Sequence, residues 1–487
     1  MLSQKTGAAA AKIKGSFSGI GRYFHELGEA VAHGDAFVKL SLVFMGAGHI
    51  RRGKYLHGAL LLALEALFIL FCGTFAAENL SKFGTLGSVQ AERVFDPVLF
   101  TNVWNDYDHS FKILLYSIVS LIVIGAFVFV WLGNVRAAYR LQKTVESGRK
   151  VPTLRENLHN ALDKNYHRTL LALPVTGIVL FTIIPLIVMI AVAFTNYDQQ
   201  HMPPNALFTW VGFDNFKSLF ENSLSITFGY SFRIVLTWTL IWAVMSTFTC
   251  YIGGILLAML INNKRTRVKK LWRTCFVAAM AVPQFVSLLL VRSFFADQGI
   301  VNTLCASIGF TDFLKQIGIL SERLNYIPFL TDANWARVMI ILINIWIGVP
   351  YLLLIATGVL MNIPQDLYEA ATIDGANAMQ QFKNITMPYM LFVTGPYLIN
   401  SVVQNINNFN VIYLLTQDVF ETQDLALASS HARETDLLVT WLFRLTNEYY
   451  NYKMASVIGI LVFVICAAIT LVCFNVVIRG NREEAMR

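Results

Sequence analysis

Residues 368–388 of this 487-residue chain read YEAATIDGANAMQQFKNITMP. The stretch is polar and rich in small residues, although it stands between two long apolar runs. Alanines such as Ala370 and Ala371 keep its surface low enough to enter a groove on another protein. The stretch therefore predicts an element on which a soluble partner docks, and an ordinary connecting loop is the alternative.

Local signals predict two short helices around a turn in this stretch. Asn362 is expected to cap the first helix. Asp374-Gly375 is expected to form the turn, because glycine adopts positive φ without strain. A second helix is expected over residues 376–385. Pro388 can then open the next apolar segment, because the first turn of a helix does not need its amide.

The composition indicates a membrane protein. The chain is 56% hydrophobic and 14% charged, and its mean hydropathy is positive, values that suit a polytopic helical protein and not a soluble one. The net charge of +8 lies mostly in loops, where it sets topology, so it does not indicate nucleic-acid binding. The six cysteines show no spacing typical of a metal site or a disulfide framework.

Apolar runs separated by basic segments predict an all-α integral membrane protein with eight transmembrane helices and both termini in the cytoplasm. Most of the 38 Lys and Arg residues fall in segments that this topology places inside, and so does the 362–388 loop. A shift by one span would invert this charge ratio. The predicted spans are 58–77, 111–133, 169–195, 233–262, 272–295, 335–361, 389–416 and 453–477.

The same reading divides the chain into segments. Within a cytoplasmic or interfacial segment at 1–57, the apolar run Phe37–Ile50 is too short to span and is expected to form a helix on or in the inner interface. The hairpin at 58–133 carries Glu65 at mid-membrane depth, where pairing with a neighbouring helix is favoured over a transport role. A basic linker at 134–168, a six-span core at 169–477 and a cytoplasmic tail at 478–487 complete the chain.

The docking stretch resembles the EAA loop of ATP-binding-cassette (ABC) importer permeases, and its Asp-Gly-Ala extension resembles the carbohydrate-uptake branch in particular. The family usually has Leu where this chain has Met387, a mild departure. The residues that carry the resemblance are Glu369, Ala370, Ala371, Asp374, Gly375, Phe382, Ile385 and Pro388.

The resemblance implies a type I importer permease fold in the bacterial cytoplasmic membrane, similar to the larger permease subunit of maltose/maltodextrin importers. It implies two copies of an ATPase subunit, a second permease subunit and an extracellular solute-binding protein as partners. No cofactor is expected on this chain, because ATP and Mg would bind the ATPase subunits. The expected ATPase-docking residues are Glu369, Ala370, Ala371, Asp374, Gly375 and Pro388.

Two of the predicted spans carry groups suited to a sugar, which presents hydroxyl edges and apolar faces. Asn344, Gly348 and Tyr351 are spaced to lie on one helical face. The next span is rich in amides, which favours a solvated cavity over hydrogen bonding between helices. These amides are Asn400, Gln404, Asn405, Asn407, Asn408 and Asn410.

The resemblance to maltose-type permeases adds a set of sugar-contact positions. Met280 and Gln284 differ from the maltose version, which leaves the identity of the sugar open, with an α-linked oligosaccharide such as maltodextrin as the first expectation. The exterior loop at 196–232 is short, so a binding protein would be engaged by small loops. The expected substrate-path residues are Met280, Gln284, Asn344, Gly348, Tyr351, Asn405 and Asn408.

Several functions are disfavoured by what the sequence lacks. It has no G-x-x-x-x-G-K-[ST] phosphate loop, so ATP hydrolysis is expected on a separate subunit. No catalytic or metal-ligating motif stands out. The alternatives to a sugar permease are an ABC permease for another solute such as glycerol phosphate, which would want cations in its path, and an ion-coupled secondary transporter, which would want intramembrane acids.

Overall fold

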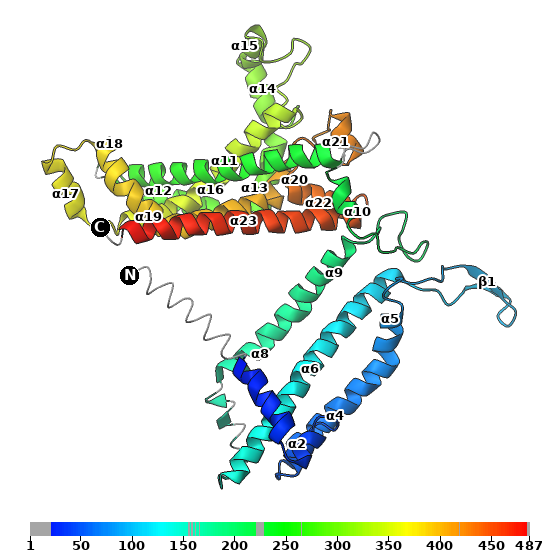
Figure 1. Ribbon diagram of the computed structural model, residues 1–487. Coiled ribbons are helices and arrows are strands. Elements are labelled where there is room, and N and C mark those ends of the chain that lie inside the picture. Colours follow the sequence, from blue (N-terminus) through cyan, green and yellow to red (C-terminus); the bar gives the residue numbers. More distant parts are fainter. Residues whose placement is uncertain are drawn as a thin grey trace. The chain divides into compact units, whose positions relative to one another are not determined.

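The computed structural model describes residues 21–484, apart from residues 154–155, 157–158, 161, 165, 221–227, 264 and 418. The chain forms two compact units (Figure 1). One comprises Met1–Ala191 with Gln200–Trp210, and the other comprises Val192–Gln199 with Val211–Arg487. The span predicted to open the transport core, 169–195, thus falls largely in the first unit.

The first unit contains a helical hairpin whose arms are both long and apolar enough to cross a membrane. The rings of Phe68 and Phe127 stack between the arms with 3.6 Å between their centroids. The first arm runs through α4 (Tyr55–Phe71), the π-helical η1 (Cys72–Ala76) and α5 (Ala77–Ser81), and the second arm is α6 (Ser110–Glu146).

The single interfacial helix predicted over Phe37–Ile50 is wrong, because the segment folds as two short helices, α2 (Ala36–Leu40) and α3 (Ala47–Ile50). Between them Gly46 has a φ of +86°, and a Cβ there would lie 2.3 Å from the carbonyl oxygen of Gly58. Glu65 accepts a hydrogen bond of 2.7 Å from the amide of Met45 at the break. The acid in the first span therefore supports this turn, in agreement with its favoured structural role.

A small antiparallel sheet is the one part of the described chain that departs from an all-helical fold. Its strands, β1 (Arg93–Asp96) and β2 (Thr101–Trp104), lie between the two arms of the hairpin in sequence and pair Arg93 with Trp104. The unit ends with α8 (Tyr166–Ile178), η2 (Val179–Ile183) and α9 (Ile184–Val192), which run on as one candidate span.

The second unit is organised around the long helices α11 (Phe228–Asn262) and α16 (Ala333–Leu360), which pack side by side (Figure 1). Glycine permits the close approach, because a Cβ on Gly254 would lie 2.6 Å from the Cβ of Leu352. Helix α19 (Met387–Ile406) packs against both helices of this pair, and α23 (Tyr452–Glu484) packs against α19.

Two predicted spans of this unit are broken. Helices α12 (Lys269–Ala281) and α13 (Gln284–Phe294) meet at 92°, with Val282 and Pro283 extended between them. The other break separates α19 from α20 (Phe409–Thr416). Six described helices are long and apolar enough to cross a membrane, or seven if the bent pair counts as one span.

Short helices cover the end of this unit that lies away from residues 362–388 (Figure 1). Arg444 and Asp436 form a buried ion pair of 2.8 Å there. Burial raises the pKa of Asp436, while Arg444 opposes that rise. The helices at this end are α10 (Asp214–Ser218), α21 (Leu425–Ser429) and α22 (Leu438–Asn447), whereas α14 (Ile300–Ser307) and α15 (Phe310–Gln316) project from the side of the bundle (Figure 1).

Candidate functional site

The predicted docking stretch forms a pair of short helices. Helix α17 (Gln365–Ile373) follows Pro364, and Asp374 ends it. The prediction that Asn362 caps α17 is wrong: Pro364 occupies the N-cap position, and no side chain caps the helix. Proline fixes the backbone at the helix start, which leaves the residue two positions earlier outside the capping geometry.

The turn between the two helices has the predicted glycine conformation. Gly375 has a φ of +80°, and a Cβ built on it meets nothing within 4 Å. The second helix begins two residues later than predicted, because Asn377 and Gln380 form a reciprocal capping box. Its first turn, α18 (Ala378–Gln381), continues through the π-helical η3 (Phe382–Thr386) into α19.

The helix pair is braced internally and anchored to the core. The Tyr368 and Thr386 hydroxyls lie 2.8 Å apart, and Gln381 donates to the Thr372 hydroxyl over 2.9 Å. Below them, Phe382 packs on a core cluster that α11, α16 and α19 share. A force on the pair would therefore reach these three long helices directly.

The outer surface of the pair is exposed. Glu369, Ala370, Asp374 and Gly375 are exposed, while Ala371 and Pro388 are half-buried. The Glu369 side chain forms no hydrogen bond or ion pair with the part of the chain that the structure describes. Four of the six predicted docking residues are thus accessible to a partner.

Three exposed apolar side chains on the same pair were missed by the sequence reasoning. Ile373 is 87% exposed, Met379 71% and Leu367 48%. Large apolar side chains at such exposure within a polar segment are typical of a surface that another protein covers. Their presence in an otherwise polar loop was the signal that could have identified them.

The predicted path residues on α16 do not share one environment. Asn344 is buried, and its side-chain nitrogen lies 3.5 Å from the sulfur of Cys250 on α11. A Cβ on Gly348 would lie 2.7 Å from that same sulfur. Asn344 and Gly348 thus pack against α11, whereas Tyr351 is 50% exposed and its ring lies 6.3 Å from that of Tyr397 on α19.

The amides around the α19–α20 break divide in a similar way. The side-chain amide of Asn405 donates to the Thr247 hydroxyl over 2.9 Å, and its backbone carbonyl oxygen accepts from the indole of Trp242. Asn408 caps α20 through the amide of Val411. These two residues hold the break together.

Other amides of that set stay accessible. Asn400 and Gln404 lie one turn apart on α19 and are exposed, and Asn410 is exposed at the start of α20. None of the three side chains bonds to another described residue. They therefore offer more free hydrogen-bonding capacity than Asn405 and Asn408.

The break between α12 and α13 is flanked by the last two predicted path residues. Met280 lies in the last turn of α12, 39% exposed, and Gln284 is exposed as the first residue of α13. The helices that follow the two breaks, α13 and α20, pack against each other. Leu288 of α13 shares a buried hydrophobic cluster with Val411 and Ile412 of α20. Non-helical backbone at membrane depth is tolerated where it is buried in protein or lines a water-filled cavity, so the two breaks are a suitable setting for a polar path.

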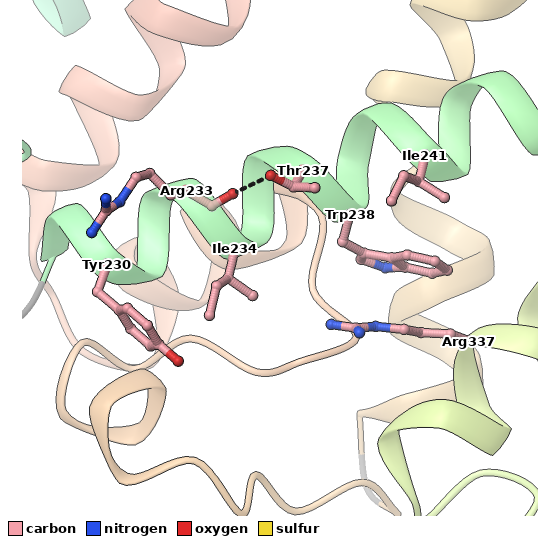
Figure 2. A pocket seen from close by; sticks show the side chains of 7 residues that line it. All are labelled: Tyr230, Arg233, Ile234, Thr237, Trp238, Ile241 and Arg337. Carbon is pink, nitrogen blue, oxygen red and sulfur yellow. Dashed lines mark hydrogen bonds between the residues drawn. The ribbon is translucent and has the colours of Figure 1, made fainter.

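A pocket of about 490 Å³ opens elsewhere in the second unit, at the start of α11. Figure 2 shows the Arg337 side chain beside the Trp238 ring, where its guanidinium lies 5.1 Å from the ring centroid. Both Nε and Nη2 of Arg337 donate to the carbonyl oxygen of Glu434. The pocket contains none of the predicted path residues, and Arg337, one of the two arginines that line it, is already engaged.

A protein-family model matches part of the second unit, and two curated relatives match most of the chain. The family model described as "binding-protein-dependent transport system inner membrane component" matches residues 250–480. The chain is 33% identical over 436 residues to the maltodextrin transport system permease protein MalC of Streptococcus pneumoniae. These residues make up 89% of this chain and 94% of MalC. It is 32% identical to the galactooligosaccharides transport system permease protein GanP of Bacillus subtilis, over 93% of this chain and 100% of GanP.

A solved structure of a bacterial ABC transporter for the import of the acidic polysaccharide alginate matches with a TM-score of 0.48 and 25% identity. The match covers 66% of this chain and 99% of the solved one. The similarity to the two permeases extends into the N-terminal third of the chain, outside the residues that the family model matches.

Proposed function

Because this chain belongs to the family of inner-membrane permease components of binding-protein-dependent ABC transporters, we propose that it forms half of the translocation path of an oligosaccharide importer. It is a multi-pass protein of the cytoplasmic membrane and not itself an enzyme. The observation that carries the proposal is the end-to-end similarity to a maltodextrin permease, over 94% of that protein. An α-linked oligosaccharide such as maltodextrin is the first candidate substrate.

A galactooligosaccharide is the second candidate, since the similarity to GanP is almost as high. Glycerol phosphate is disfavoured because an anion would want Lys or Arg in the path, and the proposed path residues are neutral. An ion-coupled secondary transporter is disfavoured because Glu65 already accepts a backbone hydrogen bond in the first unit.

The proposed path combines the two helix breaks with accessible groups on α16 and α19. Met280 and Gln284 flank one break, and Asn405 and Asn408 support the other. Tyr351 offers an exposed ring for the apolar face of a sugar. We add Asn400 and Gln404 as contacts, and we assign Asn344 and Gly348 to the packing that positions α16.

The proposed topology keeps eight spans with both termini in the cytoplasm. In support, six described helices and the bent pair α12–α13 have suitable length and composition, and α19 with α20 would supply the eighth. The segments proposed to be cytoplasmic hold most of the Lys and Arg residues. The 362–388 loop then faces the compartment that contains ATP.

The proposed mechanism is alternating access driven from outside the chain. A solute-binding protein delivers the sugar, two ATPase subunits bind ATP and Mg, and a second permease completes the path. Glu369 would enter the ATPase groove, and Gly375 would hold the turn that presents α17. Movement of the pair would pass through η3 to α19 and through the shared core to α11 and α16.

Two experiments test this proposal. A strain that lacks this permease should lose uptake of labelled maltotetraose and regain it with the intact gene. Uptake of galactooligosaccharide alone would overturn the α-linked assignment but leave the permease role intact. A mild-detergent pull-down should recover a P-loop ATPase and a second permease in a 2:1:1 ratio with this chain, and recovery of a homo-oligomer would overturn the docking assignment.

A further inference from the structure

A cavity of about 290 Å³ at the start of α4 carries three basic side chains in its wall. Arg52 and Lys54 come from the turn that precedes α4, and His57 comes from its first helical turn. Residues 151–153 close the other side, and no acidic residue lines the cavity. The cavity lies within the first unit.

The two stronger cations of this basic cavity differ in how they are held. Arg52 donates to the Gly48 carbonyl over 2.8 Å and to Asp35 over 2.7 Å, and its side chain is only 6% exposed. Lys54 is half-buried, and its ammonium has no hydrogen bond or ion pair with the described residues. Burial lowers the pKa of Lys54. An anion beside this ammonium would stabilise its charged form, and the described chain provides no such anion.

The start of α4 adds further donors to the basic cavity. Lys54 occupies the N-cap position, and no side chain caps the helix. The amides of the first turn lack acceptors on their own helix. Since Tyr55, Leu56 and His57 line the cavity, these backbone donors reinforce the basic side chains, which are the main feature of the site.

An exposed leucine stripe continues from the basic cavity along α4. Leu56 lines the cavity, and Leu60, Leu64 and Leu67 follow at intervals of four, four and three residues, which keeps them on one helical face. Their exposed fractions are 56%, 61%, 41% and 63%. Leu64 and Leu67 also line an apolar groove of about 320 Å³ between α4 and α6.

The length of the leucine stripe suits one leaflet of a bilayer. From Leu56 to Leu67 the helix rises by roughly 16 Å. Half of the hydrocarbon core of a membrane is about 15 Å. A phosphate at the cavity would therefore lie at the interface while an acyl chain of the same molecule follows the leucines and ends in the groove.

We propose that the basic cavity and the leucine stripe together bind one anionic phospholipid of the leaflet in which α4 begins. The phosphate lies among Arg52, Lys54 and the first-turn amides, and an acyl chain lies along Leu56, Leu60 and Leu64. The stripe favours a lipid over free phosphate, which has no apolar part. The site shares no residue with the docking loop or the proposed path, so it goes beyond the transport function proposed above.

The test uses the complete transporter, with its ATPase pair and second permease, in phosphatidylcholine nanodiscs that contain a minor fraction of photoactivatable phosphatidylglycerol. Crosslinks are expected in the peptides that carry residues 52–67. Lys54→Gln should weaken phosphatidylglycerol binding about fivefold, the factor that corresponds to about 1 kcal/mol per basic residue. Lys54→Arg should retain it.

Lys39→Gln is the matched control, because Lys39 is exposed on the same N-terminal segment but does not line the cavity. It should leave lipid binding unchanged, and an excess of inorganic phosphate should not displace the lipid. Displacement by inorganic phosphate would identify a free-anion site and overturn the lipid assignment. Equal crosslinking of a phosphatidylcholine probe, or no crosslinking because a partner subunit covers the stripe, would overturn it as well.

Discussion

The hydroxyl groups of Tyr368 and Thr386 lie 2.8 Å apart and join α17 to the π-helical turn that leads into α19. Thr386 is 2% exposed, whereas α17 has no buried residue. The bond therefore links the accessible part of the docking pair to the buried base of a long helix. It is one route from the proposed ATPase contact to the proposed path, beside the continuous backbone of η3 and α19.

Tyr368→Phe should lower the efficiency of coupling. It removes the hydroxyl from the link but keeps the ring, and a hydrogen bond of this kind contributes about 1 kcal/mol. We expect sugar transported per ATP hydrolysed in proteoliposomes to fall about fivefold while the complex still assembles. Tyr389→Phe is the control, since the Tyr389 hydroxyl bonds to no described residue. An unchanged transport ratio in Tyr368→Phe would argue against this route.

Substitutions at Gly375 should separate backbone conformation from size. A Cβ there has open space, but the φ of +80° costs most other residues about 1–2 kcal/mol. Gly375→Asn should keep most sugar uptake, because Asn tolerates this conformation, whereas Gly375→Val should uncouple ATP hydrolysis from uptake with normal membrane levels. Equal uptake by the Asn and Val variants would show that the turn conformation does not matter.

Ile373→Ser should weaken the contact with the ATPase subunit. The side chain is 87% exposed, so its replacement costs the isolated chain little stability, and a buried apolar anchor at an interface contributes more than about 1 kcal/mol. We expect ATPase binding to weaken about tenfold in a titration of the purified subunits. Ile319→Ser, at an exposed site outside the docking pair, should bind the ATPase normally. Normal binding by Ile373→Ser would remove Ile373 from the interface.

Asn344 and Gln404 should respond differently to truncation. Asn344 is buried against α11, so Asn344→Ala should lower the melting temperature of the complex and change the sugar requirement little. Gln404 is exposed, so Gln404→Ala should keep the melting temperature and raise the sugar concentration for half-maximal uptake. The opposite pattern would return Asn344 to the path, as the sequence predicted.

Gly348→Ala should destabilise the contact between α11 and α16, and Cys250→Ala should restore it. The added Cβ would lie 2.7 Å from the Cys250 sulfur, and overpacking of this kind costs about 1–3 kcal/mol. Thermal unfolding of the single and double variants measures the effect. A double variant no more stable than Gly348→Ala would mean that another contact limits the approach of the two helices.

The docking pair shows what local sequence can predict. Its turn glycine and its two-helix form follow from residue chemistry within a few positions, and the structure agrees at Gly375. The capping prediction failed at Asn362, because Pro364 already determines where α17 begins, and Asn377 supplied a cap that the sequence reasoning placed inside the helix.

The sequence by itself determined the membrane class, the family resemblance and the location of the proposed docking loop, because hydropathy, charge and motif spacing are properties of contiguous residues. Only the tertiary structure decided which polar groups are free. Asn344 and Asn400 are the same residue type in neighbouring spans, yet one is buried against Cys250 and the other is exposed. The difference depends on which face of each helix meets a neighbour, and that is set by packing between residues far apart in the chain.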